Sequence, residues 1–147
     1  MNSARFAVVL SGMKNWKKIL LLLVVLSPSF FFLSRAFGPN RATLDEGSLS
    51  LSGPGSFKLR LYDIDSLNFI NQLPQLAGSS GFSLGWIKKG DFIRKRDRAT
   101  IRLVKNRESG FIFLRSEHGE AYYFNLADSA DTGALYRDLR ARIEKRD

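Results

Sequence analysis

Cysteine is absent from this chain of 147 residues. The absence excludes a disulfide framework, a lipid-modified cysteine anchor and a thiolate metal site, although it does not fix the compartment. Histidine occurs once, as His118, beside Gly119 in a predicted turn. The sequence also has no metal-ligand spacing, no paired-carboxylate pattern and no nucleophile elbow. We therefore expect no bound metal, no cofactor and no enzymatic activity.

Acidic residues are missing from residues 1–42, which hold six basic residues, whereas residues 43–147 hold 17 basic and 14 acidic ones. Most of the net charge of +9 therefore belongs to the N-terminal part. Basic residues that flank an apolar segment serve to orient it in a bilayer. The high isoelectric point is consequently weak evidence for nucleic acid, and we expect no nucleic-acid partner.

An uncharged stretch of 16 residues, ILLLLVVLSPSFFFLS, lies between Lys18 and Arg35. As a helix it would cover about 24 Å, short of the roughly 30 Å hydrocarbon core of a bilayer. Residues 36–38 can extend the span, and the flanking basic side chains can reach the headgroups. We predict a single transmembrane anchor over residues 19–38. Its predicted anchoring residues are Trp16, Lys17, Lys18, Ile19, Leu26 and Leu33.

The alternative for the same segment is a cleaved secretory signal, in which residues 19–26 form the apolar region and Ser34 and Ala36 precede the cleavage site. Four basic residues precede the segment and two follow it, which predicts an N-terminus inside and residues 40–147 outside the cytoplasm of a bacterium. Met13 would also make a natural start. The predicted location is therefore the bacterial inner membrane, with a cleaved and secreted form as the alternative.

Composition divides the chain into a basic tail (1–18), the anchor or signal (19–38), a Gly/Ser-rich linker (39–47) and one domain (48–147). Short alternating apolar patterns separated by turn residues predict half-buried strands. They occur at 48–52, 57–62, 122–126 and, more loosely, at 100–104, and a continuous apolar run at 111–114 predicts a further strand. After the strands the period changes, and a predicted amphipathic helix capped by Asp128 or Ser129 follows, with its apolar face at Leu135, Leu139 and Ile143.

The segment GFSLGWIKKGDF at 81–92, followed by paired strands, YFNL at 123–126 and an Asp-initiated helix, resembles the bacterial pleckstrin-homology-like (PH) domain family. The resemblance covers roughly residues 45–145. It implies a mostly β domain with one C-terminal α-helix, namely a PH-like seven-stranded bent barrel capped by that helix. It also implies binding of lipids, peptides or sister domains without catalysis, and it names no ligand.

Nine basic residues between 88 and 107 face only two acidic residues, Asp91 and Asp97. If residues 86–95 and 99–105 form a hairpin, four of these basic residues gather at its turn. They are Arg94, Lys95, Arg96 and Arg98. Such a cluster can contact anionic headgroups. The alternative is a solvated hairpin tip that protects a sheet edge from aggregation.

Other candidate residues have simpler structural interpretations. We expect Trp86, Phe82 and Tyr62 to fill the core of a small barrel rather than line a ligand groove. Two acidic residues, Asp63 and Asp65, are expected to end a strand or to pair with a basic neighbour, because a cation site needs more oxygen ligands.

Taken together, the sequence predicts a membrane-anchored, non-enzymatic PH-like module that binds or scaffolds. Its predicted partners are the membrane, through the N-terminal segment, and a protein or a second copy of the chain. The alternatives are binding of anionic lipid headgroups by the basic hairpin, or a small-ligand carrier or enzyme on a small barrel. A carrier or enzyme would require a sizeable internal cavity.

Overall fold

The computed structural model describes residues 15–145, so the predictions on Met13 and on most of the basic tail 1–18 lie outside the described residues. The chain divides into an N-terminal unit that ends at Arg35 and a compact domain that begins at Ala36.

One helix, α2 (Asn15–Phe37), accounts for the described part of the N-terminal unit. Large apolar side chains are exposed along it, from Trp16 at 60% to Phe30 at 76%. Among the predicted anchoring residues, Ile19 and Leu26 are exposed as well, while the side chain of Leu33 is outside the described set. Across residues 15–145 no helix is both long and apolar enough to cross a membrane. The predicted transmembrane segment 19–38 is thus present as a helix but is not confirmed as a span.

The domain begins with a three-stranded antiparallel sheet of β1 (Arg41–Leu44), β2 (Ser48–Ser52) and β3 (Phe57–Arg60). The predicted strand at 48–52 is confirmed as β2. Strand β1 lies within the predicted linker 39–47 and pairs with β2. Alternation places Leu49 and Leu51 on the buried face, and Gly53 at φ 97° begins the turn into β3. Only glycine adopts that backbone conformation without strain.

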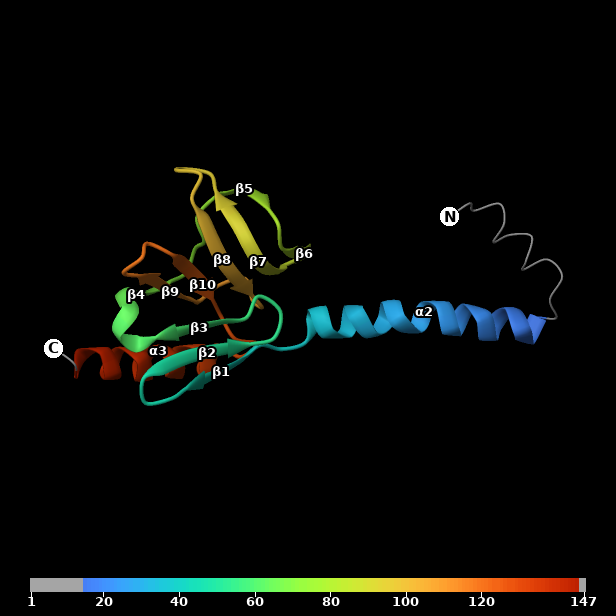
Figure 1. Cartoon of the computed structure of the whole chain (residues 1–147), viewed down its shortest axis with the longest axis horizontal. Coiled ribbons are helices and arrows are strands. Elements are labelled where there is room, and N and C mark those ends of the chain that lie inside the picture. Colours follow the sequence, from blue (N-terminus) through green and yellow to red (C-terminus); the bar gives the residue numbers. More distant parts are fainter. Residues whose placement is uncertain (1–14, 146–147) are drawn as a thin grey trace. The chain divides into compact units, whose positions relative to one another are not determined.

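The second sheet has seven strands, preceded by the short 3-10 helix η1 (Leu61–Asp63). Its strands are β4 (Ile64–Ile70), β5 (Leu76–Ser79), β6 (Phe82–Leu84), β7 (Ile87–Arg94), β8 (Thr100–Lys105), β9 (Phe111–Ser116) and β10 (Ala121–Phe124). The spatial order is β4-β9-β10-β8-β7-β5, and β6 also pairs with β7. Figure 1 shows the two sheets and the strand labels.

Strand β10 lies between β8 and β9 and runs parallel to β8. The connection from β8 to β9, residues 106–110, must therefore pass the end of β10. Asn125, the residue after β10, is fully buried at this place. Its side-chain oxygen accepts from the backbone N–H of Asn106 at 2.7 Å and of Arg107 at 3.2 Å, and its amide nitrogen donates to the carbonyl oxygens of Arg107 and Ser109.

This topology corrects the expected seven-stranded bent barrel. A parallel pair interrupts the antiparallel order, and the described strands form two sheets rather than one closed barrel. The physical reason is the connection from β8 to β9, which crosses the end of β10 and whose backbone groups hydrogen-bond to the side chain of Asn125. This connection lets β10 insert between β8 and β9, which are neighbours in sequence. The coarser prediction of a mostly β domain with one C-terminal helix is confirmed.

The C-terminal helix α3 (Ser129–Glu144) covers the core between the two sheets. Asp128 caps it, as predicted, by accepting from the backbone N–H of Ala130 at 2.6 Å. Leu139 is fully buried in a cluster with residues of β2, β3, β9 and β10, and Leu135 and Ile143 pack at its margin. A second cluster lies under β7, β8 and β10, centred on Phe92, Ile101 and Leu103. Figure 1 shows α3 beside the three-stranded sheet.

Candidate functional site

The predicted hairpin is present as β7 and β8, paired antiparallel from Lys88↔Lys105 to Ile93↔Thr100. A tight turn of residues 95–99 joins them. The backbone N–H of Arg94 donates to the carbonyl of Ala99 at 2.9 Å, and that of Arg98 to the carbonyl of Arg94 at 3.0 Å. The turn thus brings Arg94, Lys95, Arg96 and Arg98 together. We call these four residues, with Asp97 between them, the basic turn.

Within the basic turn, the guanidinium of Arg94 forms an ion pair with the carboxylate of Asp97. Its Nε and Nη2 lie 2.8 Å from Oδ1 and 2.5 Å from Oδ2 of that carboxylate, in a two-point contact. Its Nη1 also lies 3.5 Å from the hydroxyl of Tyr123 on β10. The hydrogen bonds from Arg94 lower the pKa of Asp97 to about 2. The pair therefore stays ionised at any ordinary pH, and Arg94 positions the turn rather than offering a free charge.

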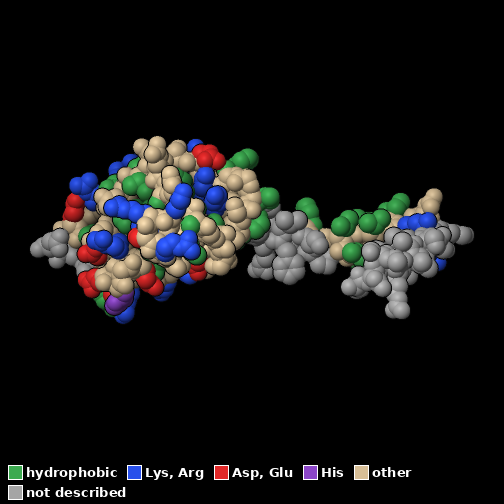
Figure 2. All heavy atoms as spheres, turned by 90° about the horizontal axis from the view of Figure 1, so that it is seen from above, with side chains coloured by type: hydrophobic (Ala, Val, Ile, Leu, Met, Phe, Trp, Pro, Cys, Tyr) green, Lys and Arg blue, Asp and Glu red, His purple; other side chains and the backbone are tan. Residues whose placement is uncertain are grey.

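The other three cations of the basic turn are exposed. Within residues 15–145 no carboxylate forms an ion pair with Lys95, Arg96 or Arg98. Three positive charges therefore face solvent at one place. In Figure 1 the turn between β7 and β8 lies at the top of the domain, and Figure 2, which looks down on that end, shows Lys and Arg side chains over the face with most acidic side chains nearer its rim.

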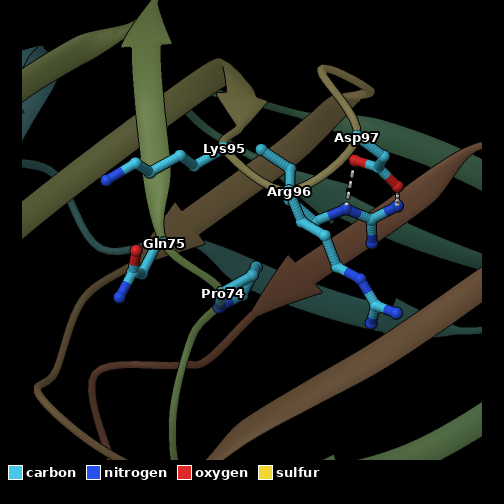
Figure 3. A pocket seen from close by; sticks show the side chains of 6 residues that line it. Pro74, Gln75, Lys95, Arg96 and Asp97 are labelled. Carbon is cyan, nitrogen blue, oxygen red and sulfur yellow. Dashed lines mark hydrogen bonds and ion pairs between the residues drawn. The ribbon is translucent and has the colours of Figure 1, made fainter.

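A cavity of about 690 Å³, open to solvent, adjoins the basic turn. It is lined by Pro74 and Gln75 from the segment before β5 and by the residues of the turn from Arg94 to Asp97. The backbone N–H of Lys95 donates to the carbonyl of Gln75 at 2.7 Å, which fixes the turn against this segment. Figure 3 shows the side chains of Lys95 and Arg96 leaving the turn in different directions, with Lys95 above Gln75 and Arg96 beside Pro74.

Backbone strain is confined to one residue of the turn. Arg98 has φ 60°, and it is the one non-glycine residue with positive φ in the described part of the chain. Replacing Arg98 by Gly should relieve this strain and raise the free energy of unfolding by about 0.5 kcal/mol, despite the greater freedom of glycine in the unfolded chain. Arg96→Gly is the matched control, because Arg96 has no positive φ and should gain nothing. Thermal unfolding of both variants checks this prediction; equal shifts would contradict it.

Three of the other five residues of the predicted basic run are engaged elsewhere. Arg102 makes a two-point contact with Asp91, at 2.8 and 3.1 Å, and Lys105 pairs with Glu108 at 2.8 Å. Lys89 is buried, with its Nζ donating to the carbonyl oxygen of Gly38 at 2.8 Å. Lys88 and Arg107 also form no ion pair within residues 15–145, so the turn holds the largest group of such cations in the run but not all of them.

Two aromatic residues are not where the sequence predicts them. Trp86 and Tyr62 were expected in the core, but they are 60% and 49% exposed, and Phe82 is half-buried. Trp86 sits in the turn between β6 and β7, where Leu84 is also 51% exposed. One signal in the sequence could have located this surface: residues 66–87 contain no charged residue. A charge-free run that forms exposed strands leaves apolar side chains in contact with solvent.

The residues considered for catalysis or metal binding lie in the turn between β9 and β10 and at the adjoining end of η1, where the backbone N–H of Glu117 donates to the carbonyl oxygen of Asp63 at 2.8 Å. His118 is exposed in the turn between β9 and β10. Asp63 pairs with Arg60 at 3.2 Å, as predicted, and Asp65 pairs with Arg115 at 2.6 Å. Residues 15–145 hold no group of three or more His, Cys, Asp or Glu side chains suited to a metal ion.

No protein-family model, curated protein or solved structure matches the chain. The resemblance to bacterial PH-like domains stays a prediction for that reason. Function must be inferred from the basic turn, the exposed apolar residues and helix α2.

Proposed function

We propose that the chain is a membrane-held binding module, not an enzyme, and that its basic turn binds the anionic headgroups of lipids. One observation carries the proposal: three exposed cations, Lys95, Arg96 and Arg98, gather at one turn while the local carboxylate, Asp97, is already held by Arg94. Arg and Lys donate several hydrogen bonds each and suit phosphate groups. A binding role also agrees with what the PH-like resemblance implies.

The apolar surface of α2 supports attachment of the chain to a membrane through this helix, which we call the membrane hold. Exposed apolar side chains occur on every side of this helix, including Leu23 at 64% and Val24 at 63%. A helix that is apolar all round is not stable in water by itself and needs an apolar environment. The excess of basic residues before the apolar stretch supports a location of the domain on the extracytoplasmic side of a bacterial membrane.

The expected contribution of the basic turn follows from its charge. Each Lys or Arg close to an anionic bilayer contributes about 1 kcal/mol, so three of them contribute up to about 3 kcal/mol, or roughly 100-fold in partitioning. Salt screens this attraction, since the Debye length falls from about 30 Å at 0.01 M to about 8 Å at 0.15 M ionic strength. Binding through the turn should therefore weaken steeply as salt is added.

The test uses the full chain with one introduced cysteine, Thr100→Cys, labelled with an environment-sensitive dye. The chain has no cysteine of its own, so the label is unique, and Thr100 is an exposed residue of β8 beside the turn. The protein is reconstituted into vesicles of phosphatidylcholine alone or with phosphatidylglycerol. We expect the dye to report lipid proximity in the anionic vesicles at low salt, and the variant Lys95→Ala/Arg96→Ala/Arg98→Ala to lose that signal.

The matched control removes three positive charges elsewhere: Lys58, Arg137 and Lys145 are exposed, and none forms an ion pair in the described part of the chain. Their triple alanine variant should keep most of the signal. Soluble glycerol phosphate in excess should reverse the signal if the phosphate group alone is recognised, and should leave it if a bilayer surface is required. A dye signal that is indifferent to lipid charge would overturn the proposed headgroup binding.

A further inference from the structure

The turn between β6 and β7 presents an exposed apolar tip. Leu84 ends β6 and Trp86 precedes β7, with 51% and 60% of their surfaces exposed. Between them Gly85 has φ 56°, and a Cβ built on it would meet no atom within 4 Å, so the tip projects into open space. Tryptophan has an apolar ring with one polar N–H, which suits it to the boundary between lipid and water.

This tip lies near the place where the chain enters the domain. Gly38 follows directly after α2, and its carbonyl oxygen accepts from Nζ of Lys89 at 2.8 Å. Lys89 stands three residues after Trp86 on β7, a separation of about 10 Å along an extended strand. Gly38 and Lys89 both belong to the domain, so this geometry does not depend on the direction in which α2 leaves it.

The sheet edge beside the tip carries no charge. Strands β5 and β6 pair with β7 from the same side and fall within the charge-free run 66–87. Sheet edges in soluble proteins usually carry charged residues that prevent unwanted contacts. An uncharged edge that ends in an exposed Trp is instead compatible with a lipid surface, where burial of charged groups would be costly.

The geometry points to a second membrane contact: the β6–β7 tip, with Leu84 and Trp86, inserts into the interface of the same bilayer that holds α2. This inference rests on the proposed membrane hold. The tip would be a second, apolar membrane anchor, formed in part by Trp86, which the sequence analysis expected in the core. The basic turn lies at the other end of β7, about 26 Å away for a strand of this length, so contact at both ends would lay β7 along the bilayer.

The two tryptophans of the chain allow a direct test, because Trp16 lies on α2 and Trp86 on the tip. Full-length Trp16→Phe keeps only Trp86, and full-length Trp86→Phe keeps only Trp16. Each is reconstituted into phosphatidylcholine and phosphatidylglycerol vesicles that contain lipids brominated at a shallow or a deep position. We expect Trp86 to shift its emission to the blue and to lose at least half of its intensity to the shallow quencher.

The control places the single tryptophan at another exposed aromatic position of the domain, Tyr62→Trp in a chain without Trp16 and Trp86. Quenching of Trp86 but not of this residue supports insertion of the tip. Quenching of Trp16 with an unquenched Trp86 overturns the inference and leaves the membrane hold intact. Absence of quenching at both natural positions overturns the membrane hold itself. Equal quenching at Trp86 and at position 62 overturns specific insertion, since the whole domain would then lie against lipid.

A second variant, Leu84→Ser/Trp86→Ser, tests the same contact without a fluorescent residue at the tip. Both side chains are exposed, so the domain should keep its thermal unfolding temperature. With the dye on Thr100→Cys, the salt needed to abolish lipid proximity should fall at least twofold, because the apolar contact no longer assists the basic turn. An unchanged salt dependence would contradict the inference.

Discussion

Replacing Asn125 by Ala is expected to lower the free energy of unfolding of the domain by about 3 kcal/mol and its unfolding temperature by about 15 °C. Asn125 is fully buried and its side chain makes four hydrogen bonds to the backbone of residues 106–109. The alanine variant leaves two N–H groups and two carbonyl groups without these partners. A buried backbone group that loses its partner costs about 1–3 kcal/mol, and water that reaches the exposed loop replaces part of the loss.

The large loss of stability should be specific to the side chain of Asn125, which bonds to the connection between β8 and β9. Asn106→Ala removes a single hydrogen bond, from its amide nitrogen to the carbonyl oxygen of Asn125 at 2.6 Å, and should cost only about 1 kcal/mol. Asn125→Asp keeps the size but replaces the donor by a carboxylate facing the carbonyl oxygens of Arg107 and Ser109, so it should be at least as harmful as alanine. Thermal and denaturant unfolding measure all three variants. Equal losses for Asn125→Ala and Asn106→Ala would contradict the assigned role.

The same residue shows where sequence patterns stop being informative. Local alternation predicts β2 at its observed bounds and β3, because each strand needs only one buried face to be recognised. The parallel pairing of β8 with β10 leaves no comparable local signal. Within YFNL, Asn125 fits the alternation of a strand. Nothing in this motif indicates that its side chain hydrogen-bonds to backbone groups of a loop 16 to 19 residues earlier in the chain. The expected seven-stranded bent barrel was wrong for this non-local reason.

Exposure at the two turns of β7 was predictable to different degrees. Charge identifies the basic turn, since four basic residues close together cannot be buried without partners. Aromatic character misleads at Trp86, because large apolar side chains in a small domain usually fill the core. The structure exposes Trp86 because the sharp turn at Gly85 carries it beyond the sheet. Absence of charge over residues 66–87 is the better guide there, and it is visible only when the whole segment is considered.

Replacing Lys89 by Met is expected to stabilise the domain by about 1–2 kcal/mol at neutral pH, because burial of a charge without a partnering carboxylate costs more than one hydrogen bond to a carbonyl returns. Lys89 is 2% exposed, and its Nζ is bonded to the carbonyl oxygen of Gly38. Methionine fills a similar volume without a charge. The half-buried neighbour Lys88 provides the control, since Lys88→Met should change stability by less than about 0.5 kcal/mol.

The pH dependence of stability distinguishes this explanation from a simple packing effect. Burial lowers the pKa of Lys89 in the folded domain below its usual value of 10.5. Between the lowered pKa and 10.5, the unfolded chain binds more protons than the folded one, so the stability of the natural chain should rise with pH across that interval. Below the lowered pKa the cost of the buried charge is present in full. Lys89→Met should therefore be more stable than the natural chain at pH 7, and the difference should shrink towards pH 10.5. A Lys89→Met variant that is less stable at pH 7, with a difference independent of pH, would mean that the bond to Gly38 outweighs the burial of the charge.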